Sequence, residues 1–132
     1  MKKEKFGRII NIISTSVKIP LKNLGVSNTT RGAVASWAKT MSNELAPFGI
    51  TVNNVLPGMT KTQRLDNLIE SIAKKKNIST EQVTTEMIDE VPAARFGDAV
   101  EIAAVAAFLA SPAAAYVNGV SIPVDGGRTG SI

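Results

Sequence analysis

The segments RIINII at residues 8–13 and ITVNNVL at residues 50–56 decide the fold class of this chain. The first is β-branched and apolar on both sides of the pleat, which predicts a strand covered on both faces. The second is a similar strand that Pro57-Gly58 stops. Between them, from about residue 28 to residue 46, apolar residues recur at helical spacing until the segment PFG at 47–49. A strand, a helix and a second strand in this order predict a parallel pair joined by a crossover helix.

Downstream of residue 58 the same patterns predict three further helices and a third strand. Residues 117–124 form that strand, and Pro123 indicates that it ends there or lies at the edge of the sheet. The helix starts are marked by Thr60 or Thr62, by Ser79 with Gln82 and by Asp98 with Glu101, the last two pairs having the form of capping boxes. The resulting order, β-α-β-α-α-α-β, predicts a parallel sheet with helices on its faces.

The first predicted strand raises a physical problem, because nothing precedes it that could cover its second edge. A strand of this composition lies inside a sheet, with neighbours on both sides. Three alternatives remain open: the edge is exposed, an assembly covers it, or the first half of the fold is missing.

Composition excludes several classes of protein. The 132 residues are 44% hydrophobic and 20% charged, with a net charge of +4, as expected for a globular domain with one core. No apolar stretch reaches the roughly 18 residues that a membrane span needs. The sequence has no cysteine and no histidine, which removes disulfides, Cys/His zinc sites, thiol nucleophiles and Ser-His-Asp triads. We therefore expect no metal site and no membrane partner.

The charge is uneven, but its distribution does not indicate a nucleic-acid-binding protein. Residues 1–61 carry nine basic and two acidic side chains, whereas residues 62–132 carry six and nine. The positive charges are scattered, and one tryptophan and one tyrosine provide no platform for stacking bases. The apolar segment after Lys2, Lys3 and Lys5 is too short for an export signal. We expect a cytoplasmic protein that does not bind nucleic acid.

Three motifs in order, GRIINIIS at 7–14, NNVLPG at 53–58 and DGG at 125–127, resemble the short-chain dehydrogenase/reductase family, and most of all its 3-oxoacyl-carrier-protein reductases. The resemblance covers about residues 7–127. It implies an α/β fold, namely a partial Rossmann-type three-layer arrangement with only the last three parallel strands and their flanking helices, in a single partial domain spanning 1–132. It also implies NAD(P) as cofactor. The ten glycines contain no G-x-x-x-G-x-G turn, and we interpret 126–130 as a tail, so we expect no tight cofactor binding to this chain alone.

The family catalyses hydride transfer with a Ser, a Tyr and a Lys, and the resemblance places Ser14, Ser27 and Arg31 at these positions. A Ser-x-x-x-Arg motif thus replaces Tyr-x-x-x-Lys. An aliphatic hydroxyl is a far weaker acid than a phenol of pKa about 10, and Arg31 can hold ribose hydroxyls but cannot shuttle a proton. The alternative for Ser27 is a cap of the following helix, and for Ser14 a turn residue at a strand end.

The segment from Pro57 to Thr62 resembles the family loop beside the nicotinamide. The resemblance implies cofactor contacts by Pro57, Gly58, Thr60 and Thr62 together with Arg31; the alternative is a helix start without a ligand. Residues 63–94 occupy the family's lid region. Its Lys74-Lys75-Lys76 run faces an acidic carrier or thioester in one interpretation and is a solvated helix end in the other.

Two functions remain open. By resemblance the chain derives from an NAD(P)-dependent oxidoreductase acting on a small carbonyl compound or a 3-oxoacyl thioester, and it is inactive as an isolated chain. The alternative is a non-catalytic truncated or assembly protein, a homo-oligomer that keeps the contacts the family makes through its last strand, the preceding helix and the helix at 28–46.

Overall fold

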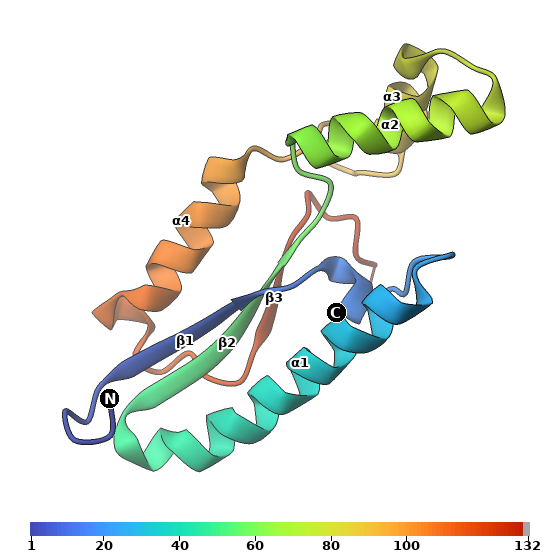
Figure 1. Cartoon of the computed structure of the whole chain (residues 1–132). Helices are drawn as coiled ribbons and strands as arrows, with labels where there is room; N and C mark the ends of the chain where they lie inside the picture. The colour runs from blue at the N-terminus through green and yellow to red at the C-terminus, as the bar shows by residue number, and fades with distance from the viewer. Residues whose placement is uncertain (131–132) are drawn as a thin grey trace.

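The computed structural model describes residues 1–130 and contains one three-stranded parallel sheet. Its strands are β1 (Gly7–Ile12), β2 (Ile50–Pro57) and β3 (Ser121–Val124), in the order β1-β2-β3 (Figure 1). β2 is therefore the central strand, and Pro123 lies on the edge strand β3, as its missing N–H requires. The α/β class and the parallel arrangement are confirmed.

Two helices cover the two faces of the sheet. Helix α1 (Gly25–Leu45) packs on one face and α4 (Ala99–Ala110) on the other (Figure 1). Because side chains alternate along β2, Val52 joins the core under α1 and Val55 joins the core under α4, and both are fully buried. The result is a three-layer α/β/α arrangement. Short 3₁₀ turns complete it at Thr15–Val17 (η1), Ala46–Phe48 (η2) and Pro112–Ala114 (η3).

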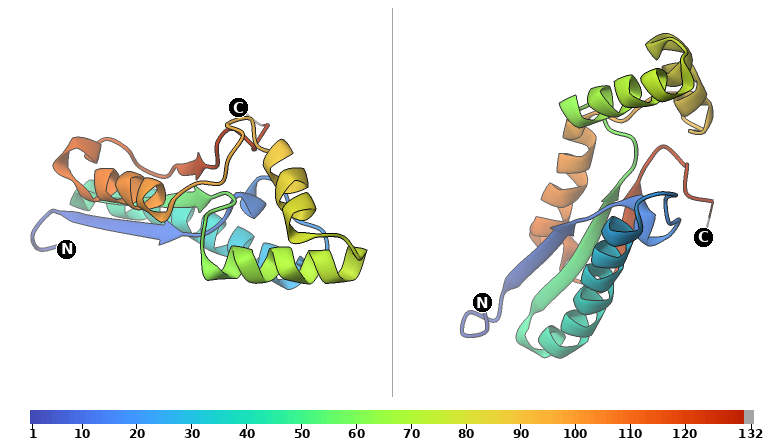
Figure 2. Two further views of the ribbon diagram at one scale, coloured as in Figure 1. Left: turned by 90° about the horizontal axis from the view of Figure 1, so that it is seen from above. Right: turned by 45° about the vertical axis from the view of Figure 1, so that its right-hand side comes forward.

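Helices α2 (Gln63–Lys76) and α3 (Thr80–Asp89) pack against each other beyond the carboxyl ends of the strands (Figure 2). They have a core of their own, separate from the two cores of the sheet. Its buried members are Leu65, Ile69, Ala73, Val83 and Phe96. This pair makes up most of the predicted lid region.

Local capping accounts for several helix ends. The Ser79 hydroxyl accepts from the N–H of Gln82 at 3.1 Å at the start of α3, and the N–H of Asp98 donates to Glu101 Oε2 at 2.8 Å at the start of α4. Helix α1 ends through η2 at Gly49, whose φ of +69° is left-handed. These ends lie within a residue or two of the predicted ones.

Helix α1 begins three residues earlier than predicted, and this changes the interpretation of Ser27. The helix starts at Gly25 without a side-chain cap, so Ser27 lies inside the first turn. Asn28, the predicted start, instead donates its side-chain N–H to the carbonyl of Leu21 at 2.8 Å. The alternative that Ser27 caps this helix is therefore wrong.

The third strand is shorter than the predicted 117–124. Asn118 lies in a loop, where its side chain accepts from the N–H of Val52 at 2.8 Å and donates to the carbonyl of Ser42 at 2.9 Å. Gly119 follows with a φ of +70°. The side-chain amide thus takes the place of a backbone partner beside β2, and strand pairing starts only at Ser121.

Strand β1 is less covered than its composition predicts. It pairs with β2 along one edge, and within residues 1–130 no strand pairs with the other edge. Its central residues are half-buried, and the Ile12 side chain is 55% exposed. The second edge of β1 is therefore unpaired within the described part of this chain.

Candidate functional site

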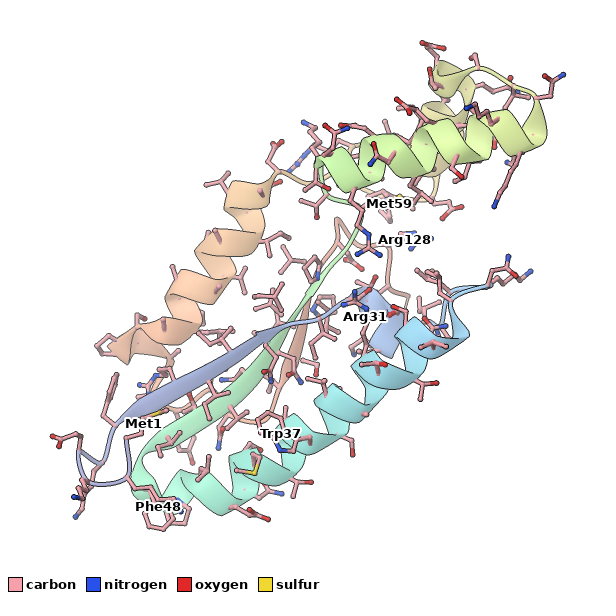
Figure 3. All side chains as sticks on the ribbon, in the orientation of Figure 1. Met1, Arg31, Trp37, Phe48, Met59 and Arg128 are labelled. Atoms are coloured by element: carbon pink, nitrogen blue, oxygen red, sulfur yellow. The ribbon has the colours of Figure 1, made fainter. Side chains whose placement is uncertain are left out.

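A cleft of about 470 Å³ opens where the carboxyl ends of β1 and β2 face the α2–α3 pair. This edge of a parallel sheet is where open α/β folds bind ligands. In Figure 3, Arg31 from α1, Met59 from the loop after β2 and Arg128 from the C-terminal segment lie around this space. All seven predicted site residues line it: Ser14, Ser27, Arg31, Pro57, Gly58, Thr60 and Thr62.

Arg31 ties helix α1 to the end of β1. Its Nε donates to Ser27 Oγ at 3.1 Å, one helical turn earlier, and its Nη1 donates to the carbonyl of Ile13. The i, i+4 spacing places the two side chains on one face of the helix. Arg31 and Ser27 are both half-buried, so the guanidinium is held in place and the Ser27 oxygen faces a cation.

Ser14 occupies the turn at the end of β1, in agreement with the alternative interpretation of Ser14 as a turn residue at a strand end. Its Oγ accepts from the N–H of Ser16 at 3.1 Å and caps η1. A hydroxyl that accepts one hydrogen bond keeps its own proton for donation. The turn position and a contact with a ligand oxygen are therefore compatible.

The loop after β2 contains a backbone N–H without an acceptor among the described residues. Thr60 forms a parallel bridge with Gly97, in which Lys61 N–H and Met59 C=O bond to Gly97. Because the bonds alternate in direction along an extended segment, the N–H of Thr60 itself points away from Gly97, and within residues 1–130 it has no acceptor.

Gly58 and Thr62 hold the two ends of this loop. A Cβ at Gly58 would lie 2.6 Å from Cβ of Asp125, so only glycine allows β2 and the segment after β3 to approach this closely. Thr62 occupies the N-cap position of α2, but its hydroxyl donates to Thr60 O at 3.3 Å and does not cap the helix. Thr62 therefore precedes the first residue of α2 without capping the helix, and its hydroxyl oxygen can still accept a hydrogen bond from a ligand at this helix N-terminus.

Sequence reasoning missed three charged residues of the cleft, namely Arg64, Glu90 and Arg128. Arg128 Nε donates to Glu90 Oε2 at 3.1 Å. We interpreted residues 126–130 as a tail, which is wrong for Arg128, because the turn before it folds back onto residues 91–93. The available signal was the turn-forming DGG followed directly by a cation.

The predicted Lys74–Lys76 run and the sequence's one tyrosine, Tyr116, both lie outside the cleft. The Lys74–Lys76 run forms the solvated last turn of α2, where Lys76 Nζ lies 2.6 Å from Glu86 Oε2. Tyr116 is fully exposed. Within the described residues there is no cluster of three potential metal ligands and no helix long and apolar enough to cross a membrane.

The only large pKa shift in residues 1–130 belongs to Glu101, on the far side of the loop. Arg95 holds this carboxylate through two hydrogen bonds, of 2.6 and 2.8 Å, and the N–H of Asp98 adds a third. Together they lower the pKa of Glu101 from 4.5 to about 2. The pair fixes the segment around Gly97, on which Thr60 depends.

Comparison with known proteins assigns the family. Residues 1–129 match the family model described as Enoyl-(Acyl carrier protein) reductase. The NADPH-dependent reductase BacG of Bacillus subtilis is 40% identical over 132 residues, covering 100% of this chain and 51% of the relative. The 3-oxoacyl-[acyl-carrier-protein] reductase FabG of Vibrio cholerae is 40% identical over 129 residues, covering 96% and 48%. The chain belongs to the short-chain dehydrogenase/reductase family.

Solved structures of this family agree with the fold. YwfH, an NADPH-dependent reductase involved in bacilysin biosynthesis, superimposes with a TM-score of 0.92 at 38% identity, covering 99% of this chain and 50% of that one. A variant of actinorhodin polyketide ketoreductase with NADPH gives a TM-score of 0.91 at 31% identity, covering 98% and 49%. The chain thus spans about half the length of the short-chain dehydrogenase/reductase relatives it matches.

The donors of the cleft fit one end of a nicotinamide dinucleotide. Arg31 Nη2 and the N–H of Thr60 have no acceptor within residues 1–130, and both belong to residues that line the cleft. Thr62 adds a hydroxyl at a helix N-terminus, where a phosphate is favoured. The sequence has no glycine-rich turn of the dinucleotide type, which in such folds holds the pyrophosphate.

Proposed function

We propose that this cleft binds the nicotinamide end of NAD(P) and a carbonyl substrate, as part of an oxidoreductase that interconverts a carbonyl compound and an alcohol. The observation that carries the proposal is the convergence of Ser14, Ser27, Arg31 and the 57–62 loop, which are far apart in the sequence, on one cleft. The relatives BacG and FabG are named as an NADPH-dependent and a 3-oxoacyl-carrier-protein reductase, which supports a ketone or 3-oxoacyl thioester as substrate.

Each polar group has a task in this proposal. Bound NAD(P)H supplies the hydride. Arg31, anchored on Ile13 and Ser27, offers Nη2 to ribose hydroxyls, and Thr60 offers its N–H to the carboxamide. Ser14 donates a hydrogen bond from its hydroxyl to the substrate carbonyl oxygen and polarises it, without transferring its proton.

Ser27 is the proton donor to that oxygen, assisted by Arg31. The guanidinium donates to Ser27 Oγ at 3.1 Å, and a cation on this oxygen strengthens the hydroxyl as a donor. Arginine stays protonated and cannot restore the proton, so solvent must do so. We therefore expect slow proton transfer compared with a Tyr-Lys pair.

Binding of half-coenzymes tests the proposal directly. Because the donors serve only the nicotinamide end, reduced nicotinamide mononucleotide and NADPH should bind to the 132-residue chain with affinities within about threefold of each other. Arg31→Gln should abolish both, whereas Arg8→Gln, which removes an arginine of β1 that does not line the cleft, should leave both unchanged. Calorimetry measures these affinities. NADPH binding more than about tenfold tighter than the mononucleotide would contradict the proposed half-site, as would no binding of either.

Turnover forms a second test. NADPH oxidation with a 3-oxoacyl thioester should be undetectable with the 132-residue chain, because the weakly held coenzyme is rarely in place. Ser27→Tyr with Arg31→Lys restores the family's motif but not the adenosine contacts, so this double variant should also be inactive. Measurable NADPH oxidation by the double variant would refute this account.

A non-catalytic assembly role is the second candidate, and exposed apolar side chains favour it. Val26 and Trp37 on α1, and Val100 and Phe108 on α4, are between 45% and 85% exposed. Burial of such residues between subunits stabilises an oligomer. Sedimentation should then give a single oligomer without coenzyme, which Trp37→Lys disrupts and Thr40→Lys, also exposed on α1, does not. A monomer at every concentration tested would eliminate this role.

A further inference from the structure

We propose that Arg128 forms an anion subsite that binds the carboxylate of the carbonyl substrate, an inference that rests on the function proposed above for the cleft. Among residues 1–130, four ionisable side chains line the cleft: Arg31, Arg64, Glu90 and Arg128. Three guanidinium groups and one carboxylate leave a formal excess of two positive charges. Such a lining favours an anionic ligand over a neutral one.

The backbone of Arg128 is held by hydrogen bonds on both sides. Asp125 Oδ1 accepts from the N–H of Gly127 at 3.0 Å, and its Oδ2 accepts from the N–H of Thr129 at 2.8 Å. One carboxylate therefore closes a turn around Arg128. A cation on a turn held in this way loses little conformational entropy when it binds a ligand.

Close packing fixes the same turn against the segment after α3. Gly126 has a φ of +65°, and a Cβ there would lie 2.7 Å from Val91 Cγ1 and 2.9 Å from Ala93 Cβ. The carbonyl of Gly126 also accepts from the N–H of Ala93 at 3.0 Å. The C-terminal segment is thus locked to the base of the lid region, with Arg128 over the cleft.

Glu90 orients the guanidinium but leaves donors for a ligand. Nε and Nη2 of Arg128 both donate to the same oxygen, Oε2 of Glu90. The Glu90 side chain is 56% exposed and that of Arg128 only 24%, so the pair is anchored from the solvent side. Nη1 has no acceptor within residues 1–130. Nη1 and the second hydrogen of Nη2 form a fork that matches a carboxylate.

The cleft lining also contains apolar side chains, which fit an apolar body. Leu24, before α1, is 41% exposed, and Leu68, on α2, is 47% exposed, although both line the cleft. Ile72 and Met87 extend this apolar lining. A ligand that covers these side chains and also reaches Arg128 is amphiphilic. We therefore assign the substrate class as oxo acids with an apolar chain, which narrows the ketones and 3-oxoacyl thioesters proposed above to ketones that carry a carboxylate.

The test measures binding to the 132-residue chain without any nicotinamide compound, so it does not depend on coenzyme binding or turnover. The probes are 4-oxodecanoate and its primary amide, which differ only in the charge at the acid end. Calorimetry gives the affinities, and the ¹⁵N signal of Arg128 Nε reports the contact. We expect the acid to bind at least about tenfold more tightly than the amide.

Three variants connect the preference to Arg128. Arg128→Gln should reduce the affinity for the acid to within about twofold of that for the amide, and Arg128→Lys should keep part of the preference because it keeps the charge. Lys76→Gln is the matched control, since Lys76 is also paired with a glutamate, Glu86, but lies outside the cleft. Thermal melting confirms that each variant is folded.

Several outcomes overturn the proposal. Equal affinity for acid and amide, no binding of either, or a preference that survives Arg128→Gln would each refute the carboxylate subsite. If Arg128→Gln weakens binding of reduced nicotinamide mononucleotide and not of the acid, Arg128 serves the coenzyme phosphate and the assignment is wrong. If the acid binds through Arg128 but the mononucleotide does not bind, the subsite stands and the proposed coenzyme site fails.

Discussion

Replacing Asn53 by alanine tests the hydrogen bonds that attach β2 to the loop before β3. The Asn53 side chain is 0% exposed; its Nδ2 donates to the carbonyl of Val117 at 2.8 Å and its Oδ1 accepts from the N–H of Val120 at 3.2 Å. Asn53 thus adds two side-chain hydrogen bonds to the backbone bonds that join β2 to the 117–120 loop. Its loss removes two hydrogen bonds at one end of the sheet.

The expected loss of folding free energy follows from those two hydrogen bonds. Each contributes about 0.5–1.5 kcal/mol net, and a buried carbonyl or N–H left without a partner costs about 1–3 kcal/mol. Some relaxation of the 117–120 loop toward water offsets part of this cost. We therefore expect Asn53→Ala to lower the free energy of unfolding by about 2–4 kcal/mol.

Urea denaturation followed by circular dichroism measures this change, with the m-value checked for constancy. The matched control is Asn67→Ala, because Asn67 makes its hydrogen bond to Gln63 on the exposed face of α2. That variant should stay within about 0.5 kcal/mol of the wild type. Faster hydrogen exchange at the Val120 amide should accompany the Asn53 substitution. A loss below about 1 kcal/mol, or one equal to that of the control, would refute the reasoning.

Three further predictions concern stability. Arg95 lowers the pKa of Glu101 to about 2, so the stability that the ionised Glu101 adds is fully present above pH 4.5 and is lost as the pH falls toward 2. Glu101→Gln should therefore flatten the decline of the urea midpoint between pH 4.5 and 2, and an unchanged pH profile would contradict this prediction. Gly126→Ala should cost at least about 1 kcal/mol, since it adds a Cβ 2.7 Å from Val91 Cγ1 at positive φ, and wild-type melting would argue against the tight turn. Leu109→Ala, at a fully buried position under the sheet, should cost about 3 kcal/mol in urea denaturation, and a loss of less than 1 kcal/mol would show that this core is loose.

Several elements could be predicted because their signals are local. The β-branched segments at 8–13 and 50–56 correspond to β1 and β2 within a residue. The placing of Ser27 and Arg31 on one helix face needs only the four-residue spacing. The predicted start of β3 was wrong because it depends on a contact with a residue far away in the sequence. The Asn118 side chain accepts from the backbone N–H of Val52 in β2, and β3 begins only after it.

In the candidate site, too, local patterns could be predicted and distant contacts could not. Motif spacing was enough to propose Ser14, Arg31 and the 57–62 loop as neighbours, because the carboxyl ends of parallel strands meet at one edge. The role of Arg128 could not be found in this way. Its place in the cleft depends on the Gly126 turn packing against Val91, a contact between residues 35 positions apart.

The order of strands and helices and the family motifs are carried by the chain itself, since periodicity, capping pairs and turn residues act within a few positions of one another. The cleft, its excess of positive charge and the half-buried edge of β1 exist only after folding. Each of these properties arises from which segments are in contact, and such contacts depend on the packing of the cores around β2 rather than on any local pattern.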